Sequence, residues 1–343
     1  MMGRGSRKYD MGLVSGGNMS TRLQNTLRII GKQIHDWKIP QLPAFHSNQQ
    51  TKLTWARIID SYDNVPEVYQ EFYKPHRTKD QAFPYSVLVP AYETFSYKVT
   101  EKVICMFQHE IQILERSGNA LATQCYPIAG ISYVETSSML LDSRIQINGV
   151  TSQGMPASSV VRFSTATDYV FRPILSRIRL YPTAPDSSGR DSEAFDHWMH
   201  LNYKFMNLAR NSLVQGEKVI CAILQPEIRR EIFTILGKTY FRTISPTHAS
   251  ILTDRELILI REEVLQSRED KYGGIWEYIP VNKIAALSTS RKNEHLLALS
   301  VQMLTDERFE CLFPASRKNE VEQLLNACMA MKLKSSEAVS VIL

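Results

Sequence analysis

A chain of 343 residues, 43% of them hydrophobic, is long enough for two domains with buried cores, which excludes the disordered and collagen-like classes. Its 40 basic and 35 acidic residues leave a formal charge of +5, which gives no reason to expect nucleic acid as a partner. No stretch reaches the roughly 18 consecutive apolar residues of a membrane-spanning helix, and MMGRGSRKYDMGLVSGG has no apolar signal-peptide core. We therefore expect a cytoplasmic protein.

The cysteines indicate a reducing compartment. None of the five stands in a C-x-x-C pair, and four lie inside apolar runs that are typical of strands or helices. Small buried hydrophobic residues explain this pattern better than metal ligands or disulfides do. The cysteines are Cys105, Cys125, Cys221, Cys311 and Cys328.

Residues 1–50 are predicted to form a flexible basic arm followed by a short amphipathic helix. Apolar residues recur at spacings of three and four between 21 and 37, which places them on one helical face. Either this face packs on the protein itself, or it binds a membrane surface or a partner helix. The apolar residues are Leu23, Leu27, Ile30, Ile34 and Trp37.

The next region, 51–180, is predicted to be a first β-rich module that ends in a helix. Between 83 and 163, short runs of β-branched and aromatic residues alternate with turn formers such as Ser117-Gly118-Asn119. A helical segment then extends to about Leu180. The segment 181–192, YPTAPDSSGRDS, has the proline, serine and glycine content of a linker.

A connecting helix is predicted over 193–214. Glu193, His197 and His200 fall on one face of it, the spacing that a metal site would use. Lys204 continues the same face and would repel a cation. We therefore interpret it as a solvated polar face and expect no metal.

A second β-rich module is predicted over 215–343, ending in the helix SRKNEVEQLLNACMAM. The pentapeptide EKVIC occurs in both modules, at 101–105 and 217–221, but the sequence around it does not agree in that register. Other offsets align better. Glu110 matches Glu256 at an offset of 146, Pro127 matches Pro280 at 153, and one apolar helical stripe is used twice at 150. The two stripes are Phe171, Ile174, Leu175 and Ile178, and Val321, Leu324, Leu325 and Cys328.

The second module resembles the bacterial pleckstrin-homology-like family in ILTDRELILIREE (251–263), WEYIPVNKIAAL (276–287) and RFECLFPASRKNEVEQLL (308–325). Thr253-Asp254-Arg255 would be a tight turn between strands. The first module departs from the pattern, with Phe107-Gln108-His109 at that turn and Pro173 inside its helix. The resemblance implies a β-rich α+β fold with two barrels or bent antiparallel sheets, each closed by a C-terminal helix.

Sequence motifs for catalysis are absent. GVTSQG and YGG match neither phosphate-binding glycine pattern, and G-x-S-x-G does not occur. The cysteines in apolar strands lack the exposed, electropositive setting of a nucleophile. We expect neither an enzyme nor a cofactor.

Function is therefore expected in binding. The first interpretation is a non-enzymatic tandem protein that binds a protein partner. The alternative is a peripheral adaptor that binds anionic lipid headgroups at the inner membrane surface; an enzyme with an unrecognised site is a third. Glu227 and Glu231, beside two of the arginines, make local charge pairing an alternative to ligand binding. The candidate ligand-binding residues are Arg229, Arg230, Lys238, Arg242, Arg291 and Lys292.

Overall fold

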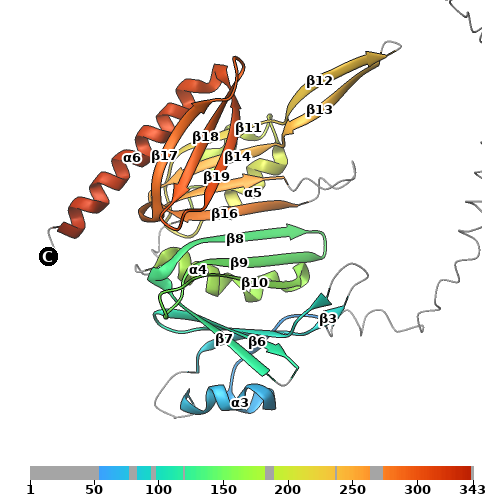
Figure 1. Ribbon diagram of the computed structural model, residues 1–343, viewed down its shortest axis with the longest axis vertical. Coiled ribbons are helices and arrows are strands. Elements are labelled where there is room, and N and C mark those ends of the chain that lie inside the picture. Colours follow the sequence, from blue (N-terminus) through green and yellow to red (C-terminus); the bar gives the residue numbers. More distant parts are fainter. Residues whose placement is uncertain are drawn as a thin grey trace, which may run out of the picture. The chain divides into compact units, whose positions relative to one another are not determined.

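The computed structural model describes residues 54–76, 83–93, 98–118, 120–181, 189–235, 238–262 and 273–340. The expected basic arm and the 21–37 helix lie outside these residues, as does most of the 181–192 linker. The described residues form antiparallel sheets with a C-terminal helix, which confirms a β-rich α+β fold (Figure 1). None of the sheets formed by these residues closes into a barrel.

The first sheet has five strands and is covered by a helix on one face. Helix α3 (Glu67–Tyr73) buries Tyr69 and Tyr73 against Val103 and Cys105. Ile104, between those two strand residues, points into a separate core on the opposite face, as the two-residue period of a strand requires. The strand order is β1 (Arg57–Ile59), β2 (Tyr85–Val89), β5 (Lys102–Met106), β6 (Glu110–Ser117), β7 (Ala120–Pro127).

The second sheet joins the two β-rich regions. Strand β8 pairs with β16, from Gly274 opposite Ser138 to Tyr278 opposite Val134, so that one sheet runs through both regions. We call this pairing the β8–β16 seam. The strand order is β10 (Pro156–Ser164), β9 (Asp142–Val150), β8 (Ile131–Met139), β16 (Gly274–Pro280), β15 (Glu256–Arg261), β14 (His248–Thr253), β11 (Val219–Gln225). The predicted tight turn falls between β14 and β15 and is confirmed.

A third sheet, of three strands, packs on one face of the seven-stranded sheet near β15. Leu257 and Leu259 of β15 point into a core shared with this sheet and α6, whereas Ile258 and Ile260 point into a core shared with α5. The sheet consists of β17 (Ile284–Arg291), β18 (Leu296–Met303) and β19 (Arg308–Pro314). Three-residue 3-10 helices connect many elements: η1 (Tyr62–Asn64), η2 (Lys74–His76), η3 (Ile128–Gly130), η6 (Val281–Lys283) and η7 (Ala315–Arg317).

Both predicted apolar stripes pack on cores. Helix α4 (Arg172–Leu180) follows η4 (Thr165–Val170), and α6 (Lys318–Ser340) follows η7. In each stripe the third residue is only partly buried and the other three are buried. Pro173, expected inside a helix, stands in the first turn of α4, where its missing N–H is not needed.

The predicted connecting helix over 193–214 is wrong as a single element. The segment forms the 3-10 helix η5 (Ser192–Trp198) and, after a break, α5 (Tyr203–Ser212). The break occurs at Asn202, whose side chain accepts a hydrogen bond from Phe205 N at 3.1 Å and so caps a new helix. The expected alignment of Glu193 with His197 and His200 therefore does not occur on one α-helix.

Two hairpins stand apart from the large sheets. The short one pairs β3 (Tyr92–Glu93) with β4 (Lys98–Val99). The long one pairs β12 (Ile228–Ile235) with β13 (Lys238–Ser245) and extends beyond β11 and β14, the strands it connects (Figure 1). Nearly every residue of the long hairpin is exposed on both faces. It therefore has no core of its own.

Candidate functional site

Four of the six candidate residues lie on the long hairpin. Arg229 and Arg230 are in β12, and Lys238 and Arg242 are in β13. Two-stranded ribbons are marginally stable in water, and this one leaves large apolar side chains exposed. Such a patch marks an interaction site more often than a structural one. The exposed apolar and aromatic residues of the two strands are Ile232, Phe233, Ile235, Tyr240, Phe241 and Ile244.

One face of the hairpin combines cations with apolar residues. Directly opposed residues share a face, and Phe233 lies opposite Tyr240 with ring centroids 4.8 Å apart. The register shift at Ile232 brings Arg230, three positions before Phe233, onto the same face. We call this the apolar-cationic face; it consists of the pairs Arg230 with Arg242, Phe233 with Tyr240, and Ile235 with Lys238.

The opposite face carries the acidic residues. Glu227 forms an ion pair with Arg229, and this ion pair raises the pKa of Arg229. Glu227 also accepts a hydrogen bond from Thr243. Glu231 accepts from Thr234 Oγ1 at 2.8 Å. The local pairing considered from sequence thus applies to Arg229. It does not apply to the apolar-cationic face, which has no acidic member.

A hollow of about 520 Å³ lies at the base of the hairpin. It is lined by Arg230 and Arg242, by Glu231, by Asn293 from the connection between β17 and β18, and by Leu296 at the start of β18. The two arginines oppose each other directly, which is unfavourable for like charges. Neither has an ion-pair partner among the described residues. An anion entering the hollow would relieve that repulsion, although it would also meet the carboxylate of Glu231.

The two other candidates do not line this hollow. Arg291 ends β17, and its Nη2 donates to Glu294 O at 3.4 Å. Lys292 Nζ lies 2.8 Å from Glu310 Oε2. Both cations therefore have local partners, although they belong to the same connection as Asn293. The structure brings Arg230 and Arg242 together and keeps Arg291 and Lys292 in contacts of their own.

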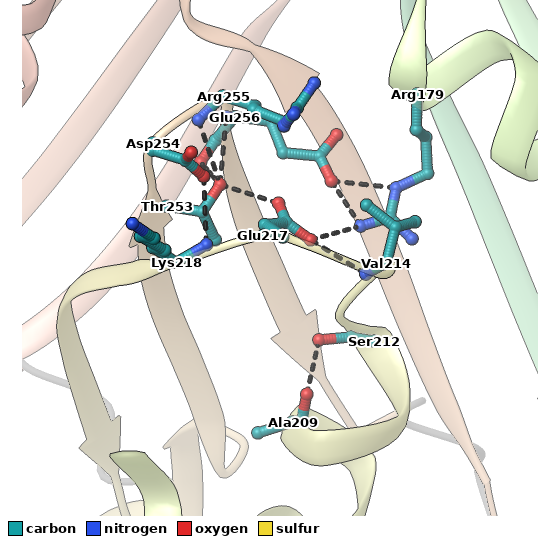
Figure 2. Close-up of polar contacts among 10 residues, drawn as sticks. All are labelled: Arg179, Ala209, Ser212, Val214, Glu217, Lys218, Thr253, Asp254, Arg255 and Glu256. Carbon is teal, nitrogen blue, oxygen red and sulfur yellow. Dashed lines mark hydrogen bonds and ion pairs between the residues drawn. The ribbon is translucent and has the colours of Figure 1, made fainter. Parts of the chain in front are cut away.

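A buried charge cluster stands beside the seam, and sequence reasoning missed it. Arg179 of α4 donates from Nε to Glu256 Oε1 at 2.7 Å and lies 3.3 Å from Glu217 Oε2 (Figure 2). Thr253 Oγ1 donates to Glu217 Oε1 at 2.6 Å, and Arg179 stacks on the Tyr278 ring at 3.9 Å. Burial raises the pKa of Glu256 to about 7, against the opposing effect of Arg179. The cluster connects α4 to the β14–β15 turn.

The other face of the sheet carries a second cluster at the seam. Glu135 of β8 and Glu277 of β16 are directly opposed. Arg144 lies 2.7 Å from Glu135, and Arg261 forms ion pairs with both glutamates. Burial raises the pKa of Glu277 to about 7, while Arg261 lowers it. The sequence signals of the two clusters were glutamates in strand-like runs: one at the start of ELILIR, one inside IWEYIP and one inside ISYVETS.

The described residues contain no group of three or more potential ligands that could hold a metal ion. Within the same ranges, no helix combines the length and the apolar character that crossing a bilayer requires. Burial raises the pKa of Cys105 and of Cys221 to about 11, which keeps these thiols protonated and poorly nucleophilic. In sequence, the chain matches neither a protein-family model nor a curated protein.

Proposed function

We propose that this chain is a non-enzymatic binding protein that docks on an anionic membrane surface through the apolar-cationic face. One observation carries the proposal: the hairpin segregates three cations and three apolar side chains onto one face and its acidic residues onto the other. On this face Phe233, Ile235 and Tyr240 are 46%, 56% and 45% exposed. Phe241, opposite Glu231 on the other face, is 54% exposed, so the sign of the charge and not apolar exposure distinguishes the two faces.

We further propose that the architecture is a tandem of pleckstrin-homology-like modules, with the hairpin inserted between the first two strands of the second. Repeated registers support this. Glu110 opposes Pro127 as Glu256 opposes Pro280, and a 3-10 helix follows each proline. The strand order β2-β5-β6-β7 parallels β11-β14-β15-β16. The short hairpin β3–β4 then occupies the place in the first module that β12–β13 occupies in the second.

The order of charged and apolar residues from the base of the hairpin to its tip fits a membrane interface. The arginine pair is nearest the base and the apolar residues are nearer the tip, so apolar groups would enter the bilayer while guanidinium groups meet phosphates. Lys238, close to the tip, can extend its amine back to the headgroups. Each cation near an anionic surface contributes about 1 kcal/mol, and burial of the apolar side chains adds about 25 cal/mol per Å².

Vesicle co-sedimentation of the full chain tests the proposal. We expect pelleting with phosphatidylcholine vesicles that contain phosphatidylserine, loss of pelleting as salt is raised, and none with phosphatidylcholine alone. The double variant Arg230→Gln/Arg242→Gln should bind roughly 30-fold more weakly, because it loses about 2 kcal/mol. Phe233→Ser should weaken binding without changing its dependence on salt.

Arg229→Gln is the matched control, because this arginine is on the opposite face and already paired with Glu227. We expect it to bind within about twofold of the wild type. If the wild type does not pellet with anionic vesicles at low salt, membrane docking is wrong. A protein partner for the same face would then be the remaining interpretation.

A further inference from the structure

A groove of about 620 Å³ lies on the seven-stranded sheet at the β8–β16 seam, between α4 and α5. It arises because two separate groups of elements cover two parts of the same face of the sheet. The first sheet and α4 cover β8 to β10, whereas η5 and α5 cover β14 to β16. A strip at the junction is left between the two coverings. The volume falls within the range of about 300–1,000 Å³ that is typical of small-molecule sites.

Apolar and aromatic side chains form part of the groove lining, beside polar and charged ones. Phe163 and Ile145 are buried within it, and Trp276 and Leu208 are partly exposed along it. Leu175 of α4 contributes from the other side. The partly exposed side chains of Trp276, Leu208 and Leu175 would contact the apolar body of a ligand, and removing that body from water would stabilise the complex.

The charges of the groove are mostly neutralised, with one exception. Arg179 is held by Glu217 and Glu256. Arg172 is paired with Asp168 at 3.5 Å, on side chains that are largely exposed. Arg190 also lines the groove, is exposed, and has no acidic partner among the described residues. The groove therefore presents one uncompensated positive charge.

The residue after Arg190 contacts the second β-rich region. Its neighbour Asp191 accepts a hydrogen bond from Val219 N at 3.0 Å, which ties this segment to the first strand of the second region. Ser176 and Asn211 add polar groups from the two flanking helices. Arg190 thus follows directly before a residue that is hydrogen-bonded to strand β11, and it lines the groove beside its apolar side chains.

We propose that this groove binds a small amphipathic monoanion, a molecule with an apolar body and a single carboxylate, sulfonate or phosphate-type group. The apolar body lies against Trp276 and Leu208, and the anionic group pairs with Arg190. Arg172 pairs with Asp168 through Nε alone, so its other N–H donors can contribute a second hydrogen bond. The site is separate from the hairpin and does not depend on membrane docking.

The test uses two matched probes on the full chain: anilinonaphthalenesulfonate, which has an aromatic body and one anion, and the uncharged N-phenylnaphthylamine. Energy transfer from tryptophan to the bound probe is measured, and Trp276→Phe should reduce it, because Trp276 lines the groove; the part that remains comes from Trp198, in the core on which Trp276 packs. Arg190→Gln should weaken sulfonate binding about tenfold and leave the uncharged probe unchanged, because only the charge-assisted contact is lost. Ser176→Trp, which fills the groove, should abolish binding of both probes.

The hairpin is the competing site, since apolar probes bind exposed aromatic residues. Phe233→Ser with Arg230→Gln/Arg242→Gln should leave energy transfer from Trp276 unchanged. Unchanged sulfonate affinity in Arg190→Gln, within about twofold, would overturn the proposal. Circular dichroism checks the fold of Ser176→Trp; should this variant not fold, the exposed Arg190 substitution and Trp276→Phe decide the question.

Discussion

The hairpin β12–β13 and the β8–β16 seam both combine arginine with glutamate, yet they hold these charges in opposite environments. On the hairpin, Arg230 and Arg242 are exposed and lack ion-pair partners among the described residues. At the seam, the side chain of Arg179 is 7% exposed and contacts two buried carboxylates. Buried charges must be paired for the fold to persist, whereas exposed ones are available to a partner. Substitutions should therefore affect stability at the seam and binding at the hairpin.

The largest expected effect is at Arg179. Arg179→Met leaves Glu217 and Glu256 buried without their cation, and we expect a loss of about 3–5 kcal/mol in the free energy of unfolding, measured by urea denaturation. Adding Glu217→Gln and Glu256→Gln to this variant should restore much of the loss, because the uncompensated charges are gone.

Arg172→Met is the matched control on the same helix. Arg172 is exposed and only weakly paired, so its replacement should change the free energy of unfolding by no more than about 0.5 kcal/mol. If Arg179→Met and Arg172→Met have equally small effects, the comparison between buried and exposed charges fails at its strongest point.

The next effect is a dependence of stability on pH. The folded-state pKa values of Glu256 and Glu277 are about 7, above the ordinary value of 4.5 that applies when the chain is unfolded. Between these values the folded state binds more protons than the unfolded state. The stabilisation is thus complete below about pH 4.5 and is lost as the pH rises through about 7.

The charges facing the two glutamates determine how they are tested. Glu256 faces Arg179, Glu217 and Tyr278, and Glu277 faces Arg261 and Glu135, with the charge on Arg144 also acting on it. Glu256→Gln/Glu277→Gln removes both titrations and keeps a hydrogen-bonding side chain. Its stability relative to the wild type should rise between about pH 5 and about pH 8, by a few kcal/mol at most. A difference that does not vary with pH would show that these carboxyls do not titrate in this range.

Much of the fold was predictable because local patterns decide it. The strand period and the turn at Thr253-Asp254-Arg255 were read from neighbouring residues, as were the apolar stripes that begin at Phe171 and Val321. The break at Asn202 shows where this fails. An apolar face continues across the break, but the capping side chain restarts the helix there.

For the hairpin site, the sequence predicted which residues are present but not which of them share a face. Cations on 229–242 were visible, but the register shift at Ile232 decides which of them share a face, and strand alternation alone would place Arg230 and Phe233 apart. The β8–β16 seam and its charge clusters could not be predicted from the sequence, for a different reason. Arg179 and Glu256 are 77 positions apart, and nothing local in either segment indicates that β8 will pair with β16.

The smallest expected effect concerns the hairpin's own stability. Arg242→Thr removes one of two directly opposed cations and places a β-branched residue in a strand, so it should stabilise the ribbon by about 0.5 kcal/mol at low salt. Hydrogen exchange of the β12 and β13 amides should then slow roughly twofold, with less change at high salt, where the repulsion is already screened. The same variant should bind anionic vesicles more weakly. A residue whose removal strengthens its own element and weakens binding is retained for the partner. Weaker binding together with faster exchange would instead mean that Arg242 stabilises the hairpin itself.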